Sequence, residues 1–349
     1  MRQTDIVEGR VDWTSVPYCD LDTESVERYS LNQGDLLISR LGNGVGNAVT
    51  VMEDRADAVF AGYLVRFQPD PAVADARFVG YQLQSLRWRE HVLSYRSGAA
   101  QPTLNAKQMG QFTFPLPALE DQRAIAATLG ALDDKIESNR RLIELVPGLV
   151  RAHGDLAITD ESVAVPVSDL ATFTNGGAYT KAATRTGRMV IRIAELNSGP
   201  GGSTVYNDIE VPDNKTARAG DILMAWSGSL GVYRWYRDEA IINQHIFKVD
   251  PDGYPAWLVF DRLEAVMPVF RALAADKATT MGHIQRGHLT STTASLPTTA
   301  AIARLDEEIA PLWERLLLAE RENLRLSRLR DALLPELLSG RLRTPAEAS

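Results

Sequence analysis

The fold is decided by two matching stretches of the chain, Leu31-Asn32-Gln33-Gly34-Asp35-Leu36-Leu37 and Ala217-Arg218-Ala219-Gly220-Asp221-Ile222-Leu223. A small, polar, glycine-bearing stretch follows each of them: Arg40-Leu41-Gly42-Asn43-Gly44 and Trp226-Ser227-Gly228-Ser229-Leu230. Further on, residues 58–65 match residues 240–247, and residues 96–117 overlie residues 276–297 without a gap. Matches that keep one order at a period of about 180 residues indicate an internal duplication.

Each copy reads as a mixed α/β domain followed by one long helix. Short apolar or β-branched runs bounded by turn residues predict strands, and longer amphipathic runs predict helices. The predicted strands are Asp35–Ser39, Val59–Phe67, Met189–Ile193, Asp221–Ala225 and Ala240–Val249, and the predicted helices are Ala76–Tyr95 and Ala256–Ala274. The fold class is therefore α+β, with domains at 1–117 and 159–297 and long spacer helices at 118–158 and 298–349.

The two long helices carry heptad seams, in which apolar residues alternate steps of four and three. The seam residues are Ile125, Leu129, Leu132, Ile136, Asn139 and Ile143 in the first helix, and Ile302, Leu305, Ile309, Leu312, Leu316, Ala319 and Asn323 in the second. Such seams bury little unless they pack on another helix, so the two helices are natural partners. The asparagine in each seam either fixes the register or sits at a frayed edge of the stripe.

Composition places limits on the function. The formal net charge of −8 counts against a simple nucleic-acid binder, although the stretch from Pro166 to Pro297 is neutral and a local basic stripe is compatible with an acidic chain. The single cysteine, Cys19, fits a reducing compartment. No apolar run approaches the ~18 residues that span a bilayer, and the N-terminus lacks the pattern of a secretory signal. We therefore expect a cytoplasmic protein that contacts no membrane.

Several blocks together resemble the specificity subunits of type I restriction-modification systems. They are Gly220-Asp221-Ile222-Leu223, Trp226-Ser227-Gly228-Ser229, Ile242-Asn243-Gln244-His245-Ile246, Thr280-Met281-Gly282-His283-Ile284, Leu116-Pro117-Ala118-Leu119-Glu120-Asp121-Gln122 and Leu333-Leu334-Pro335-Glu336-Leu337-Leu338-Ser339-Gly340. The resemblance implies two target-recognition domains, each reading one half of a split site in double-stranded DNA, and an antiparallel pairing of the long helices. It also implies docking to two methyltransferase subunits and, for restriction, to motor-nuclease subunits.

The same resemblance implies no catalysis and no cofactor in this chain, with S-adenosylmethionine held by the partner methyltransferase. A helix of about 31 residues is ~46 Å long, which corresponds to roughly 13 base pairs of duplex and predicts a bipartite target with an unread spacer. The first copy departs from the second at its start, because Ile6-Val7 lies near the equivalent of Val190-Ile191-Arg192. Either the first recognition domain is shortened at its N-terminus, or its true start lies upstream of Met1.

No catalytic motif is present: the sequence lacks a phosphate-binding Gly-x-x-x-x-Gly-Lys loop and the Pro-Pro-aromatic tetrapeptide of adenine methyltransferases. His283 and His288 stand five apart with no third ligand near them, so no metal site is predicted. His245 is expected to be a half-buried, hydrogen-bonded residue of an apolar strand. Its neighbour Gln244 is a candidate for reading adenine through a bidentate contact.

The remaining DNA-facing candidates are polar residues on glycine-bearing loops, where Lys and Arg would hold phosphates and the others would meet base edges. For each one alone, a solvated surface role is the competing interpretation. They are Arg40, Asn43, Arg96, Gln101 and Lys107 in the first copy, and Lys181, Arg185, Arg188, Ser227, Lys277, Thr279, Thr280 and Arg286 in the second. Two other functions stay open: a coiled-coil scaffold whose α/β domains bind proteins, and a self-sufficient enzyme.

Overall fold

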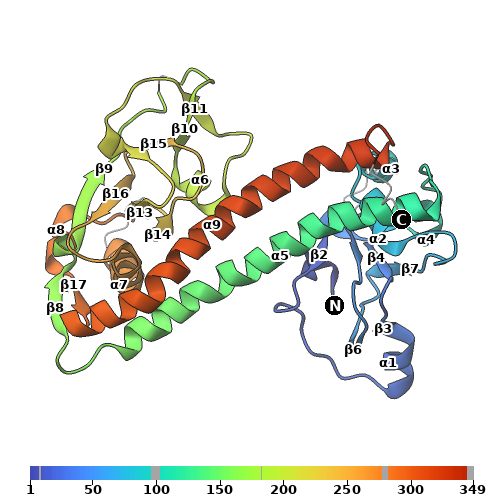
Figure 1. The fold of residues 1–349 in the computed structure, drawn as a ribbon, viewed down its shortest axis with the longest axis horizontal. Helices are drawn as coiled ribbons and strands as arrows, with labels where there is room; N and C mark the ends of the chain where they lie inside the picture. The colour runs from blue at the N-terminus through green and yellow to red at the C-terminus, as the bar shows by residue number, and fades with distance from the viewer. Residues whose placement is uncertain (8, 96–102, 182, 277–281, 344–349) are drawn as a thin grey trace. The chain divides into compact units, whose positions relative to one another are not determined.

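A computed structural model describes residues 1–349 apart from 8, 96–102, 182, 277–281 and 344–349. The chain divides into two compact units, one made of Met1–Ile136 with the chain from Leu326 onward, the other of Glu137–Arg325. Each unit combines one α/β lobe with parts of two long helices, α5 (Leu119–Leu156) and α9 (Thr299–Leu338) (Figure 1). We name the residues before α5 lobe 1, and the residues between α5 and α9 lobe 2.

Lobe 2 is built on two four-stranded sheets. The main sheet has the order β14-β13-β16-β9 with every neighbouring pair antiparallel, and the second has the order β11-β10-β15-β12 with β10 and β15 parallel. A separate pair, β8 and β17, lies at the two ends of the lobe's sequence. The elements are β8 (Val163–Pro166), β9 (Ala171–Asn175), β10 (Arg188–Ile191), α6 (Ile193–Ser198), β11 (Val205–Asn207), β12 (Thr216–Ala217), β13 (Ile222–Ala225), β14 (Gly231–Arg234), β15 (Ala240–Ile242), β16 (Ile246–Pro251), α7 (Ala256–Asp276), α8 (Arg286–Ser291) and β17 (Thr293–Leu296).

Lobe 1 repeats this plan in a shorter form. Its main sheet has the order β5-β4-β7, in which β4, β5 and β7 take the places of β13, β14 and β16. In the described part of lobe 1, no strand stands in the place of β9. The elements are β1 (Ile6–Val7), β2 (Arg10–Val11), α1 (Thr23–Tyr29), β3 (Ser30–Leu31), β4 (Leu36–Ser39), β5 (Ala48–Thr50), β6 (Arg55–Val59), β7 (Leu64–Phe67), α2 (Ala76–Gln82), α3 (Leu86–Ser94) and α4 (Ala106–Met109). The predicted fold class is confirmed.

The Gly-Asp turn that reveals the duplication is built identically in both lobes. In lobe 1, Asp35 accepts hydrogen bonds from the Asn32 amide and from Gln68, and Arg66 of β7 lies 3.4 Å from its carboxylate. In lobe 2, Asp221 accepts from the Arg218 amide at 2.7 Å, and Lys248 of β16 lies 3.0 Å away. The aspartate therefore ties the turn to a cation on the neighbouring strand, which explains why both copies keep it.

A second shared feature is an arginine bound to an acid three residues later. The Arg192 amide donates to Glu195 at 3.0 Å and its guanidinium donates to the other carboxylate oxygen at 2.6 Å. Arg2 holds Asp5 in the same way, with distances of 2.6 and 2.7 Å. The equivalent of Arg192 is therefore Arg2, and the alignment predicted from the sequence, which began the first copy near Ile6, is wrong by a few residues.

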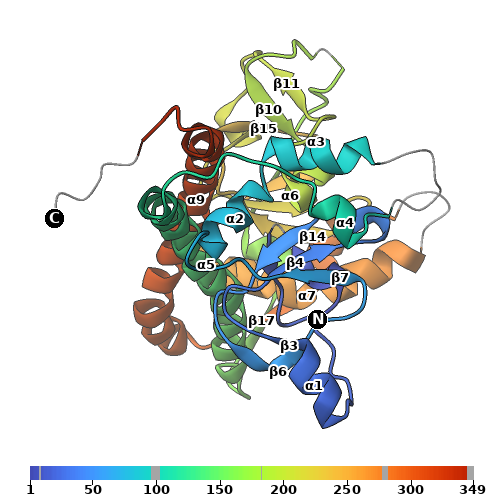
Figure 2. The same cartoon turned by 90° about the vertical axis from the view of Figure 1, so that its right-hand side faces the viewer.

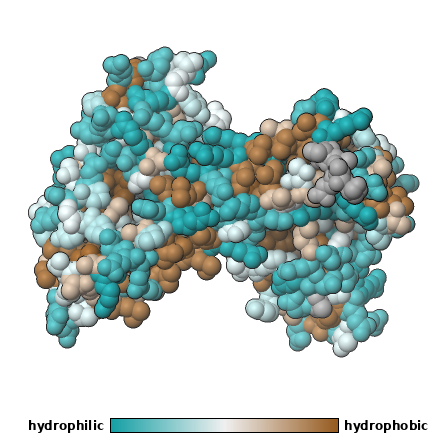
Figure 3. Space-filling model, in the orientation of Figure 1, coloured by the Kyte–Doolittle hydropathy of each residue, from teal (hydrophilic) through white to brown (hydrophobic). Residues whose placement is uncertain are grey.

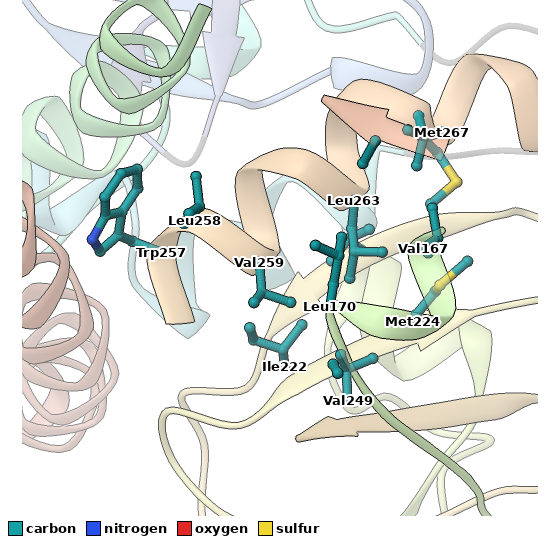
Figure 4. Close-up of a cluster of buried hydrophobic side chains, with 14 of the residues drawn as sticks. Val167, Leu170, Ile222, Met224, Val249, Trp257, Leu258, Val259, Leu263 and Met267 are labelled. Atoms are coloured by element: carbon teal, nitrogen blue, oxygen red, sulfur yellow. The ribbon is translucent and has the colours of Figure 1, made fainter. Parts of the chain in front are cut away.

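One helix, α7, covers a face of the main sheet in lobe 2 and forms the core with it (Figure 4). Val259 and Leu263 point from α7 toward Ile222 of β13 and Val249 of β16, and both are fully buried. Trp257 points the other way, toward α9, where its indole N–H donates to Asp306 at 2.7 Å. Burying such side chains contributes about 1.5–3 kcal/mol each. In lobe 1 the same face is covered by two shorter helices, α2 and α3, and α2 packs on α5 (Figure 2).

The long helices α5 and α9 are antiparallel within each unit. In the first unit, Ile125 and Leu129 of α5 form a cluster with Leu337 and Leu338 of α9 and with Phe78 of α2. In the second unit, Val146 and Val150 of α5 share a core with Leu305, Ile309 and Leu316 of α9. Of the predicted pairing residues, Leu132, Ile143, Ile302, Leu312 and Asn323 are half-buried and the others are buried.

The seam asparagines contact each other. Asn139 is 1% exposed, and its amide donates to Asn323 at 3.0 Å and to Glu322 at 2.8 Å. An amide pair buried among apolar seam residues specifies one register, because a shift by one heptad would bury both amides against hydrocarbon.

Four predicted elements are interrupted or displaced. The strand Val59–Phe67 is broken between β6 and β7, and Ala240–Val249 is broken between β15 and β16 by a turn at 243–245. The strand predicted at Met189–Ile193 ends at Ile191, where Arg192 starts the arginine-acid contact and α6 begins. The helix Ala76–Tyr95 is broken because Ser85 caps α3 by accepting from the Trp88 amide.

The structure also bears on membrane association. Among the helices of the described residues, none combines the length and the apolar character that crossing a membrane would require.

Candidate nucleic-acid interface

Three loops of lobe 2 are joined by backbone hydrogen bonds at one end of the main sheet. They are 226–230 between β13 and β14, 243–245 between β15 and β16, and 282–285 before α8. The Trp226 amide donates to the His245 carbonyl at 3.2 Å, and the Trp226 carbonyl accepts from the Ile284 amide at 3.0 Å. The Gly228 amide donates to Gly282 at 3.0 Å. The loops therefore form one rigid rim rather than independent segments.

The segment that follows β9 joins the same rim at its first two residues, Gly176 and Gly177. The Gly176 amide donates to Ile246 at 3.0 Å and the Gly177 amide donates to Ile242 at 2.9 Å. A Cβ atom on Gly176 would stand 2.2 Å from the Asn243 carbonyl oxygen. Only glycine lets the two backbones approach so closely.

Lobe 1 carries the same rim with other side chains. The Arg40 amide donates to Tyr63 and the Arg40 carbonyl accepts from Leu104, both at 2.9 Å. Leu41 bridges to Thr103 as Ser227 bridges to His283. Gly42 and Gly228 occupy equivalent positions and both have a φ of 68°, which favours glycine. The backbone frame is thus repeated, whereas the residues it presents differ.

Aromatic and polar side chains gather on the rim of lobe 2. The Trp226 ring lies 5.6 Å from the ring of His245 and 6.4 Å from that of His283, centroid to centroid. Gln244 Nε2 is 3.3 Å from His245 Nε2. Within the described chain, Trp226 Nε1, Gln244 Oε1 and Asn175 Oδ1 are buried without a hydrogen-bond partner. Buried polar atoms without partners are costly, and they cluster here beside the exposed His245.

Several of the residues predicted to face DNA lie on or beside these rims. In lobe 2, Ser227 is 8% exposed and Gln244 is half-buried on the rim, and Arg286 is exposed as the first residue of α8. Lys181 is exposed further along the segment that follows Gly177, after Tyr179, whose carbonyl accepts from the Asn207 side chain. In lobe 1, Arg40 and Asn43 are exposed on the loop between β4 and β5, and Lys107 is exposed on α4. Exposed cations next to half-buried polar groups suit phosphate and base contacts respectively.

Two predicted residues lie elsewhere. Arg188 begins β10 and donates to Glu239 at 2.7 Å, just before the parallel strand β15, whereas Gln244 follows the far end of β15. Arg185 is exposed beside it with a φ of 68°. The structure therefore places both arginines at the opposite end of that sheet from the rim. Arg96, Gln101, Lys277, Thr279 and Thr280 fall outside the described residues.

Some exposed rim residues were not among those predicted to face DNA. His245 was expected inside a strand and half-buried, and this is wrong: it is exposed in the turn between β15 and β16. Tyr63, its equivalent in lobe 1, is 53% exposed, and His283 is exposed in lobe 2. The repeat alignment pairs Tyr63 with His245 and Thr103 with His283, so it indicated that these residues occupy equivalent positions in the two lobes.

The described residues contain no group of three or more His, Cys, Asp or Glu side chains that could hold a metal ion. The one free cysteine among them, Cys19, is exposed in lobe 1. The rim of lobe 2 presents hydrogen-bonding and stacking groups, Gln244, His245 and Trp226, which are suited to binding.

Comparisons with known proteins agree with this geometry. Residues 6–147 match a family model described as the type I restriction modification DNA specificity domain. A protein of Methanocaldococcus jannaschii named "Putative type I restriction enzyme MjaX specificity subunit" is 26% identical over 147 residues, which cover 40% of this chain and 34% of that protein. The chain thus spans about a third of the length of this curated relative.

The fold is shared with a solved structure. The crystal structure of the type I restriction-modification system S subunit from M. genitalium superposes with a TM-score of 0.64, at 13% sequence identity, over 89% of this chain and 84% of that one.

Proposed function

We propose that this chain, which belongs to the family of type I restriction-modification specificity subunits, reads the sequence of double-stranded DNA and directs partner subunits that modify and cut it. Each lobe would read one half of a bipartite target, and the chain itself would catalyse nothing. Adenine methylation would belong to two methyltransferase subunits, which would also hold S-adenosylmethionine, and restriction to motor-nuclease subunits. Such a complex would act on DNA in the cytoplasm.

One observation carries the proposal: a single backbone frame occurs twice and presents different side chains. In lobe 1, the backbone of Arg40 bonds to Tyr63 and to Leu104. In lobe 2, the backbone of Trp226 makes the same two hydrogen bonds, to His245 and to Ile284. A duplicated frame with exchanged contact residues is what reading two unlike half-sites requires, since bases are distinguished by the donors and acceptors that meet their edges. A scaffold would have no need of this divergence.

The chemistry of the two rims suits different roles in contact with a duplex. Gln244 carries both a donor and an acceptor, so it could pair with the adenine edge, and the exposed Arg286 and Lys181 could neutralise phosphates. In lobe 1 the exposed Arg40 could meet either a phosphate or the two acceptors of guanine.

An exposed apolar stripe supports the proposed protein partners. On α5, Leu145, Leu149 and Leu156 are 71, 44 and 82% exposed, although they follow a heptad-like spacing. Figure 3 shows hydrophobic surface gathered where this part of α5 runs. The stripe lies outside the seam that pairs with α9, so a third helix could pack on it. We assign it to a methyltransferase subunit.

The test is to map methylated adenines across the genome of a host with and without this gene. We expect a bipartite motif that vanishes with the gene, and an unchanged motif would refute the function. A chimera in which residues 164–297 come from another specificity subunit should change only one half of the motif. If the assembled complex bound duplex DNA without weakening as salt rises, the chain would be a protein scaffold instead.

A further inference from the structure

In each lobe, the first rim loop, 40–46 or 226–230, ends at a backbone carbonyl that accepts a hydrogen bond from a side chain of a helix. In lobe 1 this carbonyl belongs to Gly46, whose amide donates to Ser39 at the end of β4. In lobe 2 it belongs to Leu230, which directly precedes the closing pair Ala225–Gly231 of the β13/β14 hairpin. The two carbonyls are equivalent, because Ala48 and Val232 face Ile38 and Met224 in the two hairpins.

A side chain from the helix behind the sheet donates to each of these carbonyls. Trp88 of α3 donates its indole N–H to the Gly46 oxygen at 2.7 Å and is 2% exposed. Arg271 of α7 donates to the Leu230 oxygen from Nη2 at 3.1 Å and from Nε at 3.3 Å. The helix also lies tightly against the first loop, since a Cβ on Gly46 would stand 2.7 Å from Val92.

We propose that Trp88 and Arg271 are positioning residues that fix the geometry of the two reading loops and thereby the bases each lobe accepts. This inference rests on the proposed function. Each loop is held on one side by the segment that bridges Leu41 to Thr103 or Ser227 to His283, and on the other side by this donor. Without the donor, the Gly46 or Leu230 carbonyl loses the side-chain hydrogen bond that ties this side of the loop to the helix behind the sheet. Base-edge hydrogen bonds tolerate only a few tenths of an ångström, so a loosened loop loses discrimination before it loses binding.

The two donors share no chemistry except their N–H groups. One is a neutral, buried indole and the other is a charged guanidinium on an exposed residue, yet both reach the same backbone atom. The common element is therefore the restrained carbonyl and not a particular side chain. A role confined to packing would not require a donor at this atom in both lobes.

The first test measures the loops without reference to DNA. In Trp88→Phe and Arg271→Met, amide hydrogen exchange should rise about tenfold in residues 40–46 and 226–230 respectively, the effect expected from losing one hydrogen bond that a buried carbonyl needs. Arg271→Lys keeps a donor and should restore most of the protection. Trp235→Phe and Arg218→Met remove an indole N–H and a guanidinium elsewhere in lobe 2 and serve as controls. Unchanged exchange in Trp88→Phe and Arg271→Met would overturn the proposal.

The second test uses the chain assembled with its methyltransferase subunits. We expect Trp88→Phe to relax one half of the methylated motif and Arg271→Met the other half, with the opposite half unchanged. Unrelaxed motifs in both variants would overturn the proposal. It would also be overturned if Arg271→Met kept the motif but lowered by about one the slope of log binding constant against log salt concentration, because that change identifies a phosphate contact. A wild-type complex without a motif would refute the proposed function alone, because the exchange experiment judges the loop restraint independently.

Discussion

Removing the carboxylate of Glu320 on α9 should destabilise the second unit strongly, because it is the charged partner of a buried arginine. Arg234 of β14 donates to Glu320 at 2.7 Å and to the Trp313 carbonyl at 2.8 Å, and its guanidinium lies 4.3 Å from the centre of the Trp313 ring. The two charged side chains are only 4 and 15% exposed. Glu320→Ala therefore leaves a buried guanidinium without its counter-charge.

The size of the effect follows from what remains around Arg234. Breaking a buried ion pair from one side costs about 3–5 kcal/mol, and the retained carbonyl and ring contacts place the expected loss near the lower end, at about 3 kcal/mol. Burial raises the pKa of Glu320 and lowers the pKa of Arg234 despite their contact, so desolvation outweighs their attraction. Replacing both by apolar residues should consequently cost little.

The assay is a double-mutant cycle read by calorimetry and urea unfolding. Glu320→Ala should lower the melting temperature by roughly 6–12 °C, given about 2–4 °C per kcal/mol for a unit of this size. Arg234→Met should behave similarly, whereas the pair Arg234→Met with Glu320→Leu should return to within about 1 kcal/mol of the wild type. Additive losses in the double variant would show that the two residues do not act as a pair, and the reasoning would fail.

Three further outcomes are expected. Burial alone would raise the pKa of Glu195, but the hydrogen bonds from Arg192 outweigh burial and lower it. The ionised carboxylate therefore contributes its full stabilisation above the ordinary pKa of 4.5 and loses it as pH falls through the lowered pKa. Glu195→Gln should accordingly flatten the acid limb of a profile of unfolding free energy against pH. Asn139→Leu should lower the free energy of unfolding by about 1–3 kcal/mol, and adding Asn323→Leu should recover most of it in urea titrations. Gly176→Ala should weaken DNA binding by the complex severalfold because its Cβ meets a backbone oxygen, whereas Gly201→Ala, which has no atom within 4 Å of its added Cβ, should not.

The duplication and the long helices could be predicted from the sequence because both are periodic. Heptad spacing identified Ile125, Leu129, Ile309 and Leu316, all of which are buried, and the helix at Ala256–Ala274 is confirmed as α7. Periodicity reports burial directly, since it is set by which face of an element meets the core.

Breaks within elements could not be predicted in the same way. The turn at 243–245 interrupts the predicted strand Ala240–Val249 at Asn243-Gln244-His245, three polar residues that include no glycine or proline, so the local signal for a break is weak. The Asn243 amide donates to Ile191 at 3.2 Å, and the Ile246 amide donates to the Asn243 carbonyl. The chain thereby passes from β15 in the second sheet to β16 in the main sheet. Such a transfer depends on pairing with β10, which lies far away in the sequence, so the neighbouring residues alone do not predict it.

The candidate site shows the same division between local and distant information. Loop composition pointed to Arg40 and Ser227, but it also pointed to Arg188, which is engaged by Glu239 at the far end of its sheet. Arg271, by contrast, belongs to a helix and carries no loop signal at all. Its role emerges only when the two lobes are compared atom by atom, because the repeated quantity is a carbonyl partner and not a residue type.

The net charge of −8 is compatible with DNA binding when the arginines are divided into those bound to carboxylates and those exposed beside the rims. Arg2, Arg192 and Arg234 each neutralise a buried or half-buried carboxylate inside one unit, so they contribute to folding and offer little to a phosphate. Among the residues that the structure describes, the exposed cations beside the rims, such as Arg40 and Arg286, are few. Long-range attraction to DNA would then be weak, and discrimination would rest on short-range contacts made by the restrained loops. That balance suits a subunit whose partners could supply further contacts to the duplex.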